Sequence, residues 1–483
     1  MTRIALTSMS SQRAARVLCL ALGIGLAGCA PMTPPASPVA LPVPAAYPER
    51  PADAAATVAL PAWQDFYADP DLRRVIALAL DNSRDLRTAV LRVNEAAAAY
   101  GIQRAGLAPV VNGSVEGTRA QVPPAQSPTG RPLLGNQFQA GIGLSDWELD
   151  LWGRLRSLNE AAQDTWLAAD ANRRAATASL VAQVADAYLG VREVDERLAL
   201  ARETLASRDE SVRIFRRRYD LGAASRLNVT QVELLRQQAA AQVAQLEQAR
   251  AQGRALLDLL VGTPVTLEAP AGALGTAPLA RDLDPGLPSD LLLERADLAA
   301  AERQLAAARA NVGAARAAFF PRISLTAAFG TASTSLDTLF DSETRAWRFT
   351  PSLALPIFNG GRLKGQLAVA QVRTDLAVAQ YERTIQVAFR DVADALAARR
   401  WLGDQAEALR ATLALQGERA RLARLRYENG SAAYLEVLDA ERERFGAEQQ
   451  LVQLRRQQLS ARVALYRALG GGARRMPGAV AQQ

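Results

Sequence analysis

The sequence has 483 residues, a formal net charge of +7 and no histidine. Because histidine is the commonest general base and a common metal ligand, its absence excludes histidine-dependent catalysis. The only cysteines are Cys19 and Cys29. Nearly every basic residue is arginine, and no lysine-rich or aromatic-interleaved patch occurs. We therefore predict that the protein is not an enzyme, has no cofactor and no metal site, and binds no nucleic acid.

Residues 1–28 have the pattern of a cleaved leader, with three arginines before a short apolar stretch at 17–26. That stretch is too short to span a bilayer. The letters LAGC at 26–29 follow from the end of this stretch. They resemble the lipobox, the motif at which bacterial lipoproteins are cut and then acylated on the cysteine, here Cys29. The alternative is an ordinary signal peptide followed by a chance cysteine. Ala30 in place of aspartate favours the outer membrane over the inner. Residues 29–61, rich in Pro and Ala, are predicted to form an extended lipidated tether.

An internal repeat organises the rest of the chain. The letters YDLG at 219–222 recur as YENG at 427–430, and GRL at 153–155 recurs at 361–363, both at an offset of 208. The sequence therefore predicts two copies of one unit, at 62–286 and 287–472, followed by a flexible tail at 473–483.

Each copy is predicted to begin with an alanine-rich helix, at about 72–104 and about 290–318. Pro109 and Pro321 follow these helices, and proline ends a helix by steric clash and by loss of an amide donor. After each proline the apolar period changes towards 2, which predicts strand hairpins at 110–150 and 322–357. The expected strands of the first hairpin are 111–119 and 138–149. Loops rich in Pro, Gly, Ser and Thr are expected at 120–136 and 333–346.

A helix of more than sixty residues is expected after Gly153 and again after Gly361, which we interpret as the kinks from strand to helix. Each long helix, about 90–100 Å at 1.5 Å per residue, is predicted to end in a turn. These turns contain Gly222 and Gly430, at tips near 220–228 and 428–436. Returning helices are expected at 226–261 and 434–469, where apolar or small residues recur at the heptad spacing of a coiled coil.

The strands raise a closure problem. Four strands per chain cannot close a barrel, and an open sheet in lipid leaves backbone groups unsatisfied at several kcal/mol each. If the strands meet lipid, several chains must pool them, and three chains supply twelve strands. The predicted fold class is therefore α+β: a trimeric outer-membrane β-barrel with four strands per chain, continued by a long α-helical barrel.

Four stretches resemble the TolC-like outer-membrane efflux family, in the lipoprotein branch that serves resistance-nodulation-division pumps. They read SDWELDLWGRLR at 145–156, LPSDLL with DLAAAE at 287–302, FFPRISL at 319–325 and LPIFNGGR at 355–362. The resemblance covers nearly the whole chain. It implies a homotrimer in outer-membrane lipid that extends into the periplasm. It also implies a periplasmic adaptor protein, an inner-membrane pump, and export of drugs and toxic compounds through a gated duct.

The resemblance also implies site residues. Leu435 matches an apolar ring and Asp439 an acidic ring of a periplasmic gate, with Glu436 adding acid beside them. Tyr427 and Arg426 match positions that hold the tips shut by cross-helix bonds. The alternative is that Leu435 is an ordinary core position of the heptad pattern and that Asp439 lies on a solvated helix face. Two positions depart from the family pattern, since Ala432 replaces a basic residue and Asn228 stands where an acidic residue is common. Asp220 and Arg226 are the residues of this chain that could replace the missing charges.

An acidic cluster precedes the first kink. Strand alternation predicts Asp146, Glu148 and Asp150 on one face, as a lumen-facing ring of charge rather than a catalytic pair. Within transport, the rival functions are a type I secretion duct and a metal-efflux duct. A rival of another class is a non-channel periplasmic coiled-coil scaffold, which predicts no strand hairpins. The sequence names neither the substrates nor the cognate pump and adaptor.

Overall fold

The computed structural model describes residues 32–35, 42–44, 46–47, 60–268, 274, 279, 283 and 295–472. The leader, Cys29, most of the predicted tether, the LPSDLL stretch and the tail at 473–483 lie outside the described residues. The chain divides into two units. The first includes Val93–Ala169 and Ala301–Tyr381, and the second includes Ala40–Arg92, Asp170–Ala300 and Glu382–Gln483. Two 67-residue helices, α5 (Arg154–Asp220) and α9 (Arg362–Glu428), contribute residues to both units.

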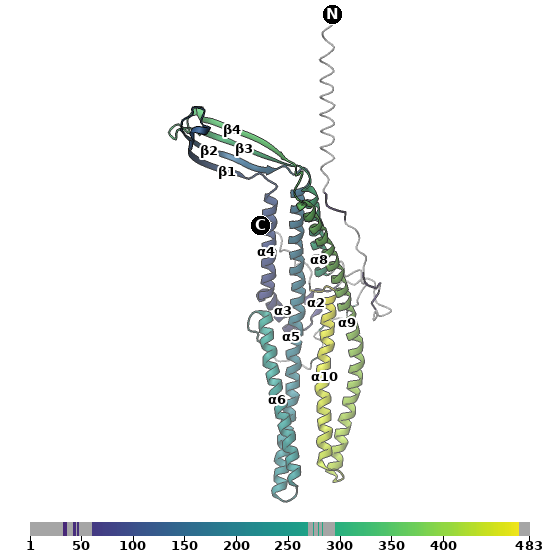
Figure 1. Ribbon diagram of the computed structural model, residues 1–483. Helices are drawn as coiled ribbons and strands as arrows, with labels where there is room; N and C mark the ends of the chain where they lie inside the picture. The colour runs from purple at the N-terminus through teal and green to yellow at the C-terminus, as the bar shows by residue number, and fades with distance from the viewer. Residues whose placement is uncertain are drawn as a thin grey trace. The chain divides into compact units, whose positions relative to one another are not determined.

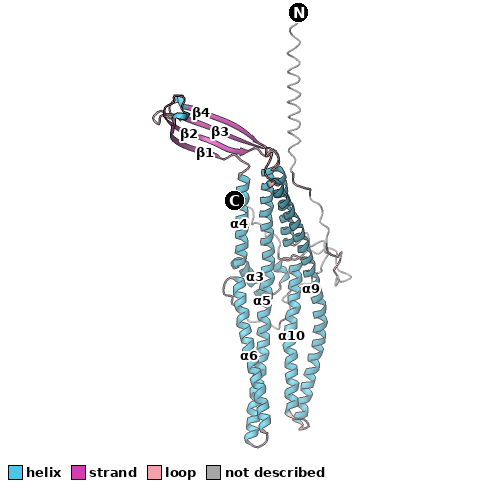
Figure 2. Ribbon diagram, in the orientation of Figure 1, coloured by secondary structure: helices cyan, strands magenta, loops and turns pink. Residues whose placement is uncertain are grey.

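The first unit contains one antiparallel sheet of four strands in the order β1-β2-β3-β4 (Figures 1 and 2). The strands are β1 (Val111–Val122), β2 (Leu133–Glu148), β3 (Arg322–Ser333) and β4 (Arg345–Ala354). The central pairing of β2 with β3 joins a hairpin from each half of the chain. Gly141 and Gly330 face each other across this pair, and a Cβ on Gly330 would lie 2.1 Å from the Ala140 carbonyl oxygen. The close approach of these two strands therefore requires glycine at this position.

The sheet has one apolar and one polar face. Ile142, Phe329 and Trp347 lie directly across from one another on three neighbouring strands, and all three side chains are exposed. The same face also presents a further set of exposed apolar side chains: Val111, Val115, Phe349 and Leu353. On the opposite face, the Ser324 and Ser352 hydroxyls are hydrogen-bonded at 2.7 Å. Among the described residues, no helix is both long enough and apolar enough to cross a membrane.

The strand ends differ from the prediction. In the first hairpin the ladder runs from Val111 to the pair Val122 and Leu133, so the predicted loop at 120–136 was too long. The polar and glycine residues at both ends of the predicted loop extend the ladder instead, because ladder hydrogen bonds join backbone groups and do not depend on the side chains. In the second hairpin β4 ends at Ala354, before the predicted bound of 357, and Pro356 has no amide hydrogen to extend the ladder.

Aromatic and alanine contacts pack the helices of the first unit. The α4 helix (Arg84–Ala105) contributes Tyr100, whose ring stacks on Trp166 of α5 at a centroid distance of 5.7 Å. The α8 helix (Ala296–Ala317) packs Ala307 and Ala310 against Ala161 of α5. Because alanine is small, these two helix axes approach closely.

The second unit has an aromatic core where its short helices meet its long ones. Phe66, on α2 (Trp63–Phe66), stacks on Tyr466 of α10 (Tyr434–Ala468) at 4.1 Å, and Tyr67 packs edge-on against both rings. Next, Asp69 caps α3 (Pro70–Asn82) and accepts a hydrogen bond from the Tyr188 hydroxyl at 2.7 Å. Burial is the main cause that raises the pKa of Tyr188 above its ordinary value.

The first predicted helix, at about 72–104, is in fact two helices. Ser83 has φ −58° and ψ 128°, outside the helical region, and it separates α3 from α4. The α6 helix (Arg226–Val261) packs against this break. Gly262, the residue that directly follows α6, lies beside Asn82 and Ser83. A Cβ on Gly262 would lie 2.4 Å from the Asn82 carbonyl oxygen. The interruption therefore lies at a tertiary crossing that local propensity does not reveal.

Candidate functional site at the hairpin turns

The two turns between long helices have the same backbone geometry. In the first, the Gly222 amide donates to the Tyr219 carbonyl at 2.9 Å and the Ala223 amide to the Arg218 carbonyl at 2.7 Å. In the second, the Gly430 and Ser431 amides donate in the same pattern, at 3.0 and 2.9 Å. This is the Schellman motif that ends a helix on a left-handed residue. The glycine φ values are 77° and 72°, which explains the glycine at each turn.

The helices that return from the turns begin differently. Ser225 caps α6: its hydroxyl accepts from the Asn228 amide, and the Asn228 side chain accepts from the Ser225 amide. Such a capping box contributes about 1 kcal/mol. By contrast, Ala433 precedes α10 and provides no side-chain cap. Asn228, which replaces an acidic residue of the family pattern, therefore stabilises the first turn, and the second turn lacks an equivalent.

Three of the predicted gate residues, Leu435, Glu436 and Asp439, lie at the start of α10, and the other two, Arg426 and Tyr427, lie at the end of α9. Leu435 is 50% exposed in the single chain. Glu436 forms an ion pair with Arg426 across the turn at 2.9 Å. Asp439 is not a free carboxylate, because its two oxygens each accept from a different arginine, Arg419 and Arg442, both at 2.6 Å. The charge of Asp439 is therefore compensated within the chain, and its place in an acidic ring stays a prediction.

Tyr434, which the sequence reasoning missed, joins the two hairpins. Its ring lies 4.7 Å from that of Phe215 on α5 and 4.9 Å from that of Tyr427 on α9. Its hydroxyl shares a hydrogen bond with the Ser211 hydroxyl at 2.9 Å. Arg218 also donates a hydrogen bond to the Tyr427 hydroxyl. An aromatic residue at the first position of the returning helix was the available signal.

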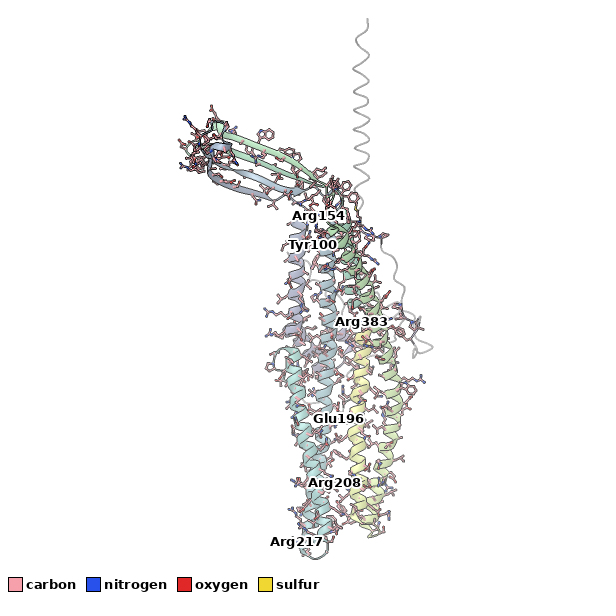
Figure 3. All side chains as sticks on the ribbon, in the orientation of Figure 1. Tyr100, Arg154, Glu196, Arg208, Arg217 and Arg383 are labelled. Atoms are coloured by element: carbon pink, nitrogen blue, oxygen red, sulfur yellow. The ribbon has the colours of Figure 1, made fainter. Side chains whose placement is uncertain are left out.

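A second missed contact lies about two helical turns further from the tips. The buried Arg208 of α5 forms an ion pair with Glu441 of α10 at 3.0 Å, and Glu441 also pairs with Arg424 of α9 at 2.5 Å (Figure 3 labels Arg208). One carboxylate therefore joins three helices. Asp220 and Arg226, suggested as substitutes for the missing gate charges, are exposed at the first turn and are not among the residues of this contact.

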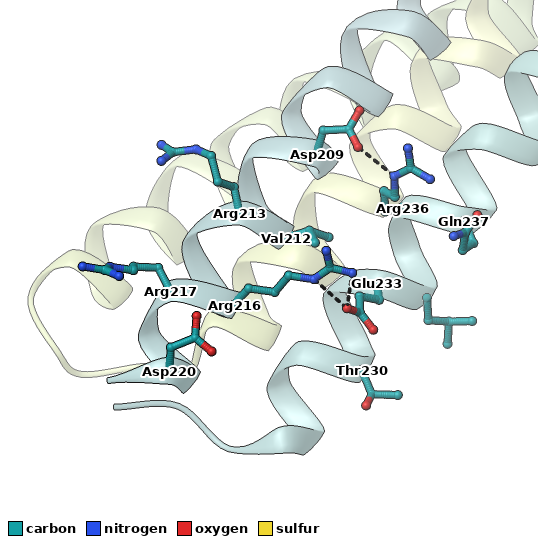
Figure 4. Close-up of a pocket in the computed structure, with 11 residues that line it drawn as sticks. Asp209, Val212, Arg213, Arg216, Arg217, Asp220, Thr230, Glu233, Arg236 and Gln237 are labelled. Carbon is teal, nitrogen blue, oxygen red and sulfur yellow. Dashed lines mark hydrogen bonds and ion pairs between the residues drawn. The ribbon is translucent and has the colours of Figure 1, made fainter. Parts of the chain in front are cut away.

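A groove of about 1030 Å³ lies along the first hairpin, between α5 and α6 (Figure 4). Its charged residues are mostly paired: Arg216 contacts Glu233 at 2.6 Å and Arg236 contacts Asp209 at 2.7 Å. The groove is open to solvent. Over the part of the chain described, no group of three or more His, Cys, Asp or Glu residues could hold a metal ion.

The predicted strand-to-helix kinks lie in the first unit. Gly153 has φ 76° directly before α5, and Gly361 has φ 85° directly before α9. The prediction that Asp146, Glu148 and Asp150 share one strand face was wrong. A bulge between Leu144 and Trp147 shifts the register, and Asp146 itself has φ 51°.

Two of the three acidic side chains share an arginine, and the third caps a helix. Arg322 contacts both Asp146, at 2.8 Å, and Glu148, at 3.0 Å. Asp150 lies beyond the strand and accepts from the Leu155 and Arg156 amides at the start of α5. The acidic cluster is thus a set of ion pairs and a helix cap rather than a row of free charge.

Comparisons with known proteins agree over most of the chain. The sequence model of the family described as "Outer membrane efflux protein" matches residues 75–263 and 287–471. The chain is 42% identical over 457 residues to outer membrane protein OprJ of Pseudomonas aeruginosa, covering 94% of this chain and 95% of OprJ. It is 43% identical over 410 residues to the toluene efflux pump outer membrane protein TtgF of Pseudomonas putida, covering 85% of each.

A solved structure shares the fold. The open state of the MtrE outer membrane channel of Neisseria gonorrhoeae superposes with a TM-score of 0.83 at 37% identity. The match covers 92% of this chain and 99% of that one.

The turn glycines give a test of the tip geometry. A Cβ on Gly430 meets no atom within 4 Å, so Gly430→Ala should destabilise the turn only through its left-handed φ, by roughly 1–2 kcal/mol. Gly417 lies inside α9 with equally open surroundings, and Gly417→Ala should instead stabilise the helix by about 0.5–1 kcal/mol. The midpoint of thermal unfolding, followed by circular dichroism in detergent, should fall for Gly430→Ala and rise for Gly417→Ala. A midpoint for Gly430→Ala at or above that of the unchanged protein would contradict the turn assignment.

Proposed function

The chain belongs to the outer membrane efflux protein family, whose members are efflux channels rather than enzymes, and we propose that three copies form the gated exit duct of a tripartite efflux system. It is an outer-membrane component of an efflux pump. The finer proposal is a homotrimer that works with a periplasmic adaptor and an inner-membrane resistance-nodulation-division pump. It exports drugs and other toxic small molecules and performs no covalent chemistry. One relative is named for toluene efflux, which places apolar small molecules among the cargo to test first.

The four-stranded sheet is the observation that supports this proposal most strongly. Its strands β1 and β4 are both edges, and one face presents exposed Ile142, Phe329 and Trp347. In lipid each edge needs a partner, because every backbone amide and carbonyl must be hydrogen-bonded. Three copies joined edge to edge give twelve strands with no free edge, with the apolar face towards lipid and the polar face towards a wide lumen.

A conductance measurement tests the duct directly. The purified protein should run as a trimer by mass photometry in detergent, and it should insert into planar bilayers and conduct in discrete steps. The reason is that the sheet can close only when copies associate. A monodisperse monomer that still conducts would overturn the trimer, and a trimer that never conducts would favour a coiled-coil scaffold.

The proposed layout of the mature chain follows the order of its elements. Both halves have the sequence helix, strand hairpin, 67-residue helix and returning helix, which supports a duplicated duct unit at 62–286 and 287–472. Before these units, the proposal places an acylated Cys29 and a tether at 29–61, and after them a tail at 473–483. The tether would hold the assembled duct at the membrane into which the acyl chains on Cys29 insert.

The anchor has its own test. Cys29→Ser should abolish labelling with radioactive palmitate, because no other cysteine remains after cleavage at residue 28. Trimers should still form in reduced amount, since the sheet can insert without the acyl chains. Labelling of Cys29→Ser at the level of the unchanged protein would show that the lipobox interpretation is incorrect.

The proposed gate lies at the turns of the α9–α10 hairpins, where three copies would converge. Leu435 would form an apolar ring that excludes water, and the Asp439 carboxylates would lie one helical turn away. Arg419 and Arg442 neutralise Asp439 within each chain, which would reduce repulsion when three such carboxylates approach. Tyr427, Arg426 and Glu436 would hold each hairpin in the closed position.

The repeat supplies a matched control for this gate. Leu227 is the counterpart of Leu435 at the first turn, and it is 65% exposed. Leu435→Ala should raise the resting conductance in planar bilayers and admit vancomycin to the periplasm, because it removes the apolar plug. Leu227→Ala should leave the resting conductance unchanged. If both variants behave alike, or if Leu435→Ala has no effect, the gate lies elsewhere.

A further inference from the structure

The two edge strands of the sheet, β1 and β4, each carry an arginine on the apolar face (Figure 1 shows the strands). Because side chains alternate along a strand, Arg119 lies on the same face of β1 as Val115 and Val111. Arg345, the first residue of β4, lies on the same face as Trp347. The strand pairing also places Arg345 in one cross-strand row with Val115. Both arginines are exposed, and both therefore stand on the face that the proposed barrel turns towards lipid.

The chain supplies no anion for these two arginines. Among the described residues, neither Arg119 nor Arg345 takes part in an ion pair or a side-chain hydrogen bond. Glu343 is close to Arg345 in the sequence but does not pair with it. By contrast, Arg154 and Arg322 of the same unit both pair with Glu148. The two edge arginines therefore differ from their neighbours in having an unmatched charge on an apolar surface.

Both arginines lie at the hairpin-turn end of the sheet. Arg119 lies eight residues after Val111 on β1, and Arg345 eight residues before Leu353 on β4. This separation is roughly 26 Å of strand. A lipid-facing arginine is costly at the centre of a bilayer and costs little at its interface. Trp347, the next residue of β4 on this face, is of the aromatic type that borders the apolar band of a membrane barrel. The arginines therefore mark the edge of the apolar band that lies furthest from the helices.

Closure of the proposed barrel brings the two arginines together. The free edges of the described sheet are β1 and β4, so β1 of one copy pairs with β4 of the next. The two strands have 12 and 10 residues, and matching their ends places Arg345 opposite one of residues 120–122. The apolar face is continuous only if that residue is Gln121, because residues 120 and 122 face the other side. Arg119 then lies directly opposite Trp347 and is the diagonal neighbour of Arg345, at about 7–8 Å.

We infer that each seam between copies binds the phosphates of an outer-leaflet glycolipid of the lipid A class, through Arg345 of one copy and Arg119 of the next. This inference rests on the proposed trimeric barrel and adds a ligand to its seams. Two guanidinium groups so close to each other repel, and a phosphate that accepts from both removes the repulsion. The planar fork of arginine donors matches phosphate oxygens better than a lysine ammonium does. Binding of the lipid should therefore stabilise the association of copies.

The surroundings of the arginines favour a lipid over a soluble anion. The same face continues from Arg345 into the exposed apolar side chains of Trp347, Phe349 and Leu353, which would lie along acyl chains. In the proposed duct the helices extend into the periplasm, so the hairpin turns lie in the outer leaflet. The lipid of that leaflet carries phosphates on an acylated glucosamine disaccharide. At the helix end of the sheet, by contrast, Arg322 already pairs with Asp146 and with a second carboxylate.

The stability of the delipidated full-length trimer in detergent tests this site. Bisphosphorylated lipid A should raise the temperature at which the trimer dissociates, followed by mass photometry of heated samples. Neither dephosphorylated lipid A nor inorganic phosphate at the same concentration should raise it. In the double variant Arg119→Gln with Arg345→Gln, the lipid A concentration that gives half of the rise should increase by at least about tenfold. The control Arg348→Gln removes the same charge from the opposite face of β4 and should respond like the unchanged protein.

The outcomes separate the lipid site from the duct. If the double variant responds like the unchanged protein while both form trimers, the site is wrong and the proposed duct stands. An equal rise with phosphatidylglycerol at the same phosphate concentration also overturns the site, because the seam would then select charge and not this lipid. If the double variant does not assemble, Arg119→Gln and Arg345→Gln are measured singly, and each should weaken the response. If the unchanged protein is a monomer under every condition, the proposed trimer fails and the site fails with it.

Discussion

The open edges of the sheet are the constraint on which the rest of the molecule depends. The ladder satisfies the backbone between β1 and β4, but the outer side of each edge strand has no partner within the described chain. An apolar face with Ile142, Phe329 and Trp347 favours lipid, where an unpaired edge is costly. A sheet of this kind is stable in a membrane only as part of a larger closed structure. Association of copies is therefore a condition for the proposed duct rather than an addition to it.

The helical part of the molecule meets a different requirement, since helices of up to 67 residues must hold together along their length. Alanine contacts such as Ala161 with Ala310 bring helices close. Near the turns, apolar contacts around Val232 and Leu438 are supplemented by polar ones, of which the Arg208–Glu441 pair is the most buried. A carboxylate that pairs with two arginines on different helices links hairpins in a defined geometry. Loss of one such partner would leave a buried charge uncompensated.

The two turns are alike in backbone and unlike in stabilisation. Both end on a glycine with φ above 70°, yet only α6 has a side-chain cap. The α10 helix begins instead with Tyr434, whose ring and hydroxyl contact the neighbouring hairpin. The second turn therefore depends on tertiary contacts where the first depends on a local motif. This difference agrees with a proposed gate at the second turn, because contacts between hairpins can be broken while each hairpin stays intact.

Local patterns in the sequence determined the elements that depend on neighbours in the chain. Proline positions, the change of period at the strands and the repeated turn glycines predicted four strands and two helices of more than sixty residues. The described residues contain these four strands and two helices of 67 residues. The resemblance of the motifs to the efflux family predicted the family that the comparisons show. Only the tertiary structure decided the interruption at Ser83, the bulge at Asp146 and the pairing of Asp439 with two arginines. Each of these features depends on a residue of another helix or strand: Gly262 for the break, β3 for the bulge and Arg419 for the pairing. Spacing along the chain specifies which face a residue occupies, but not what that face meets.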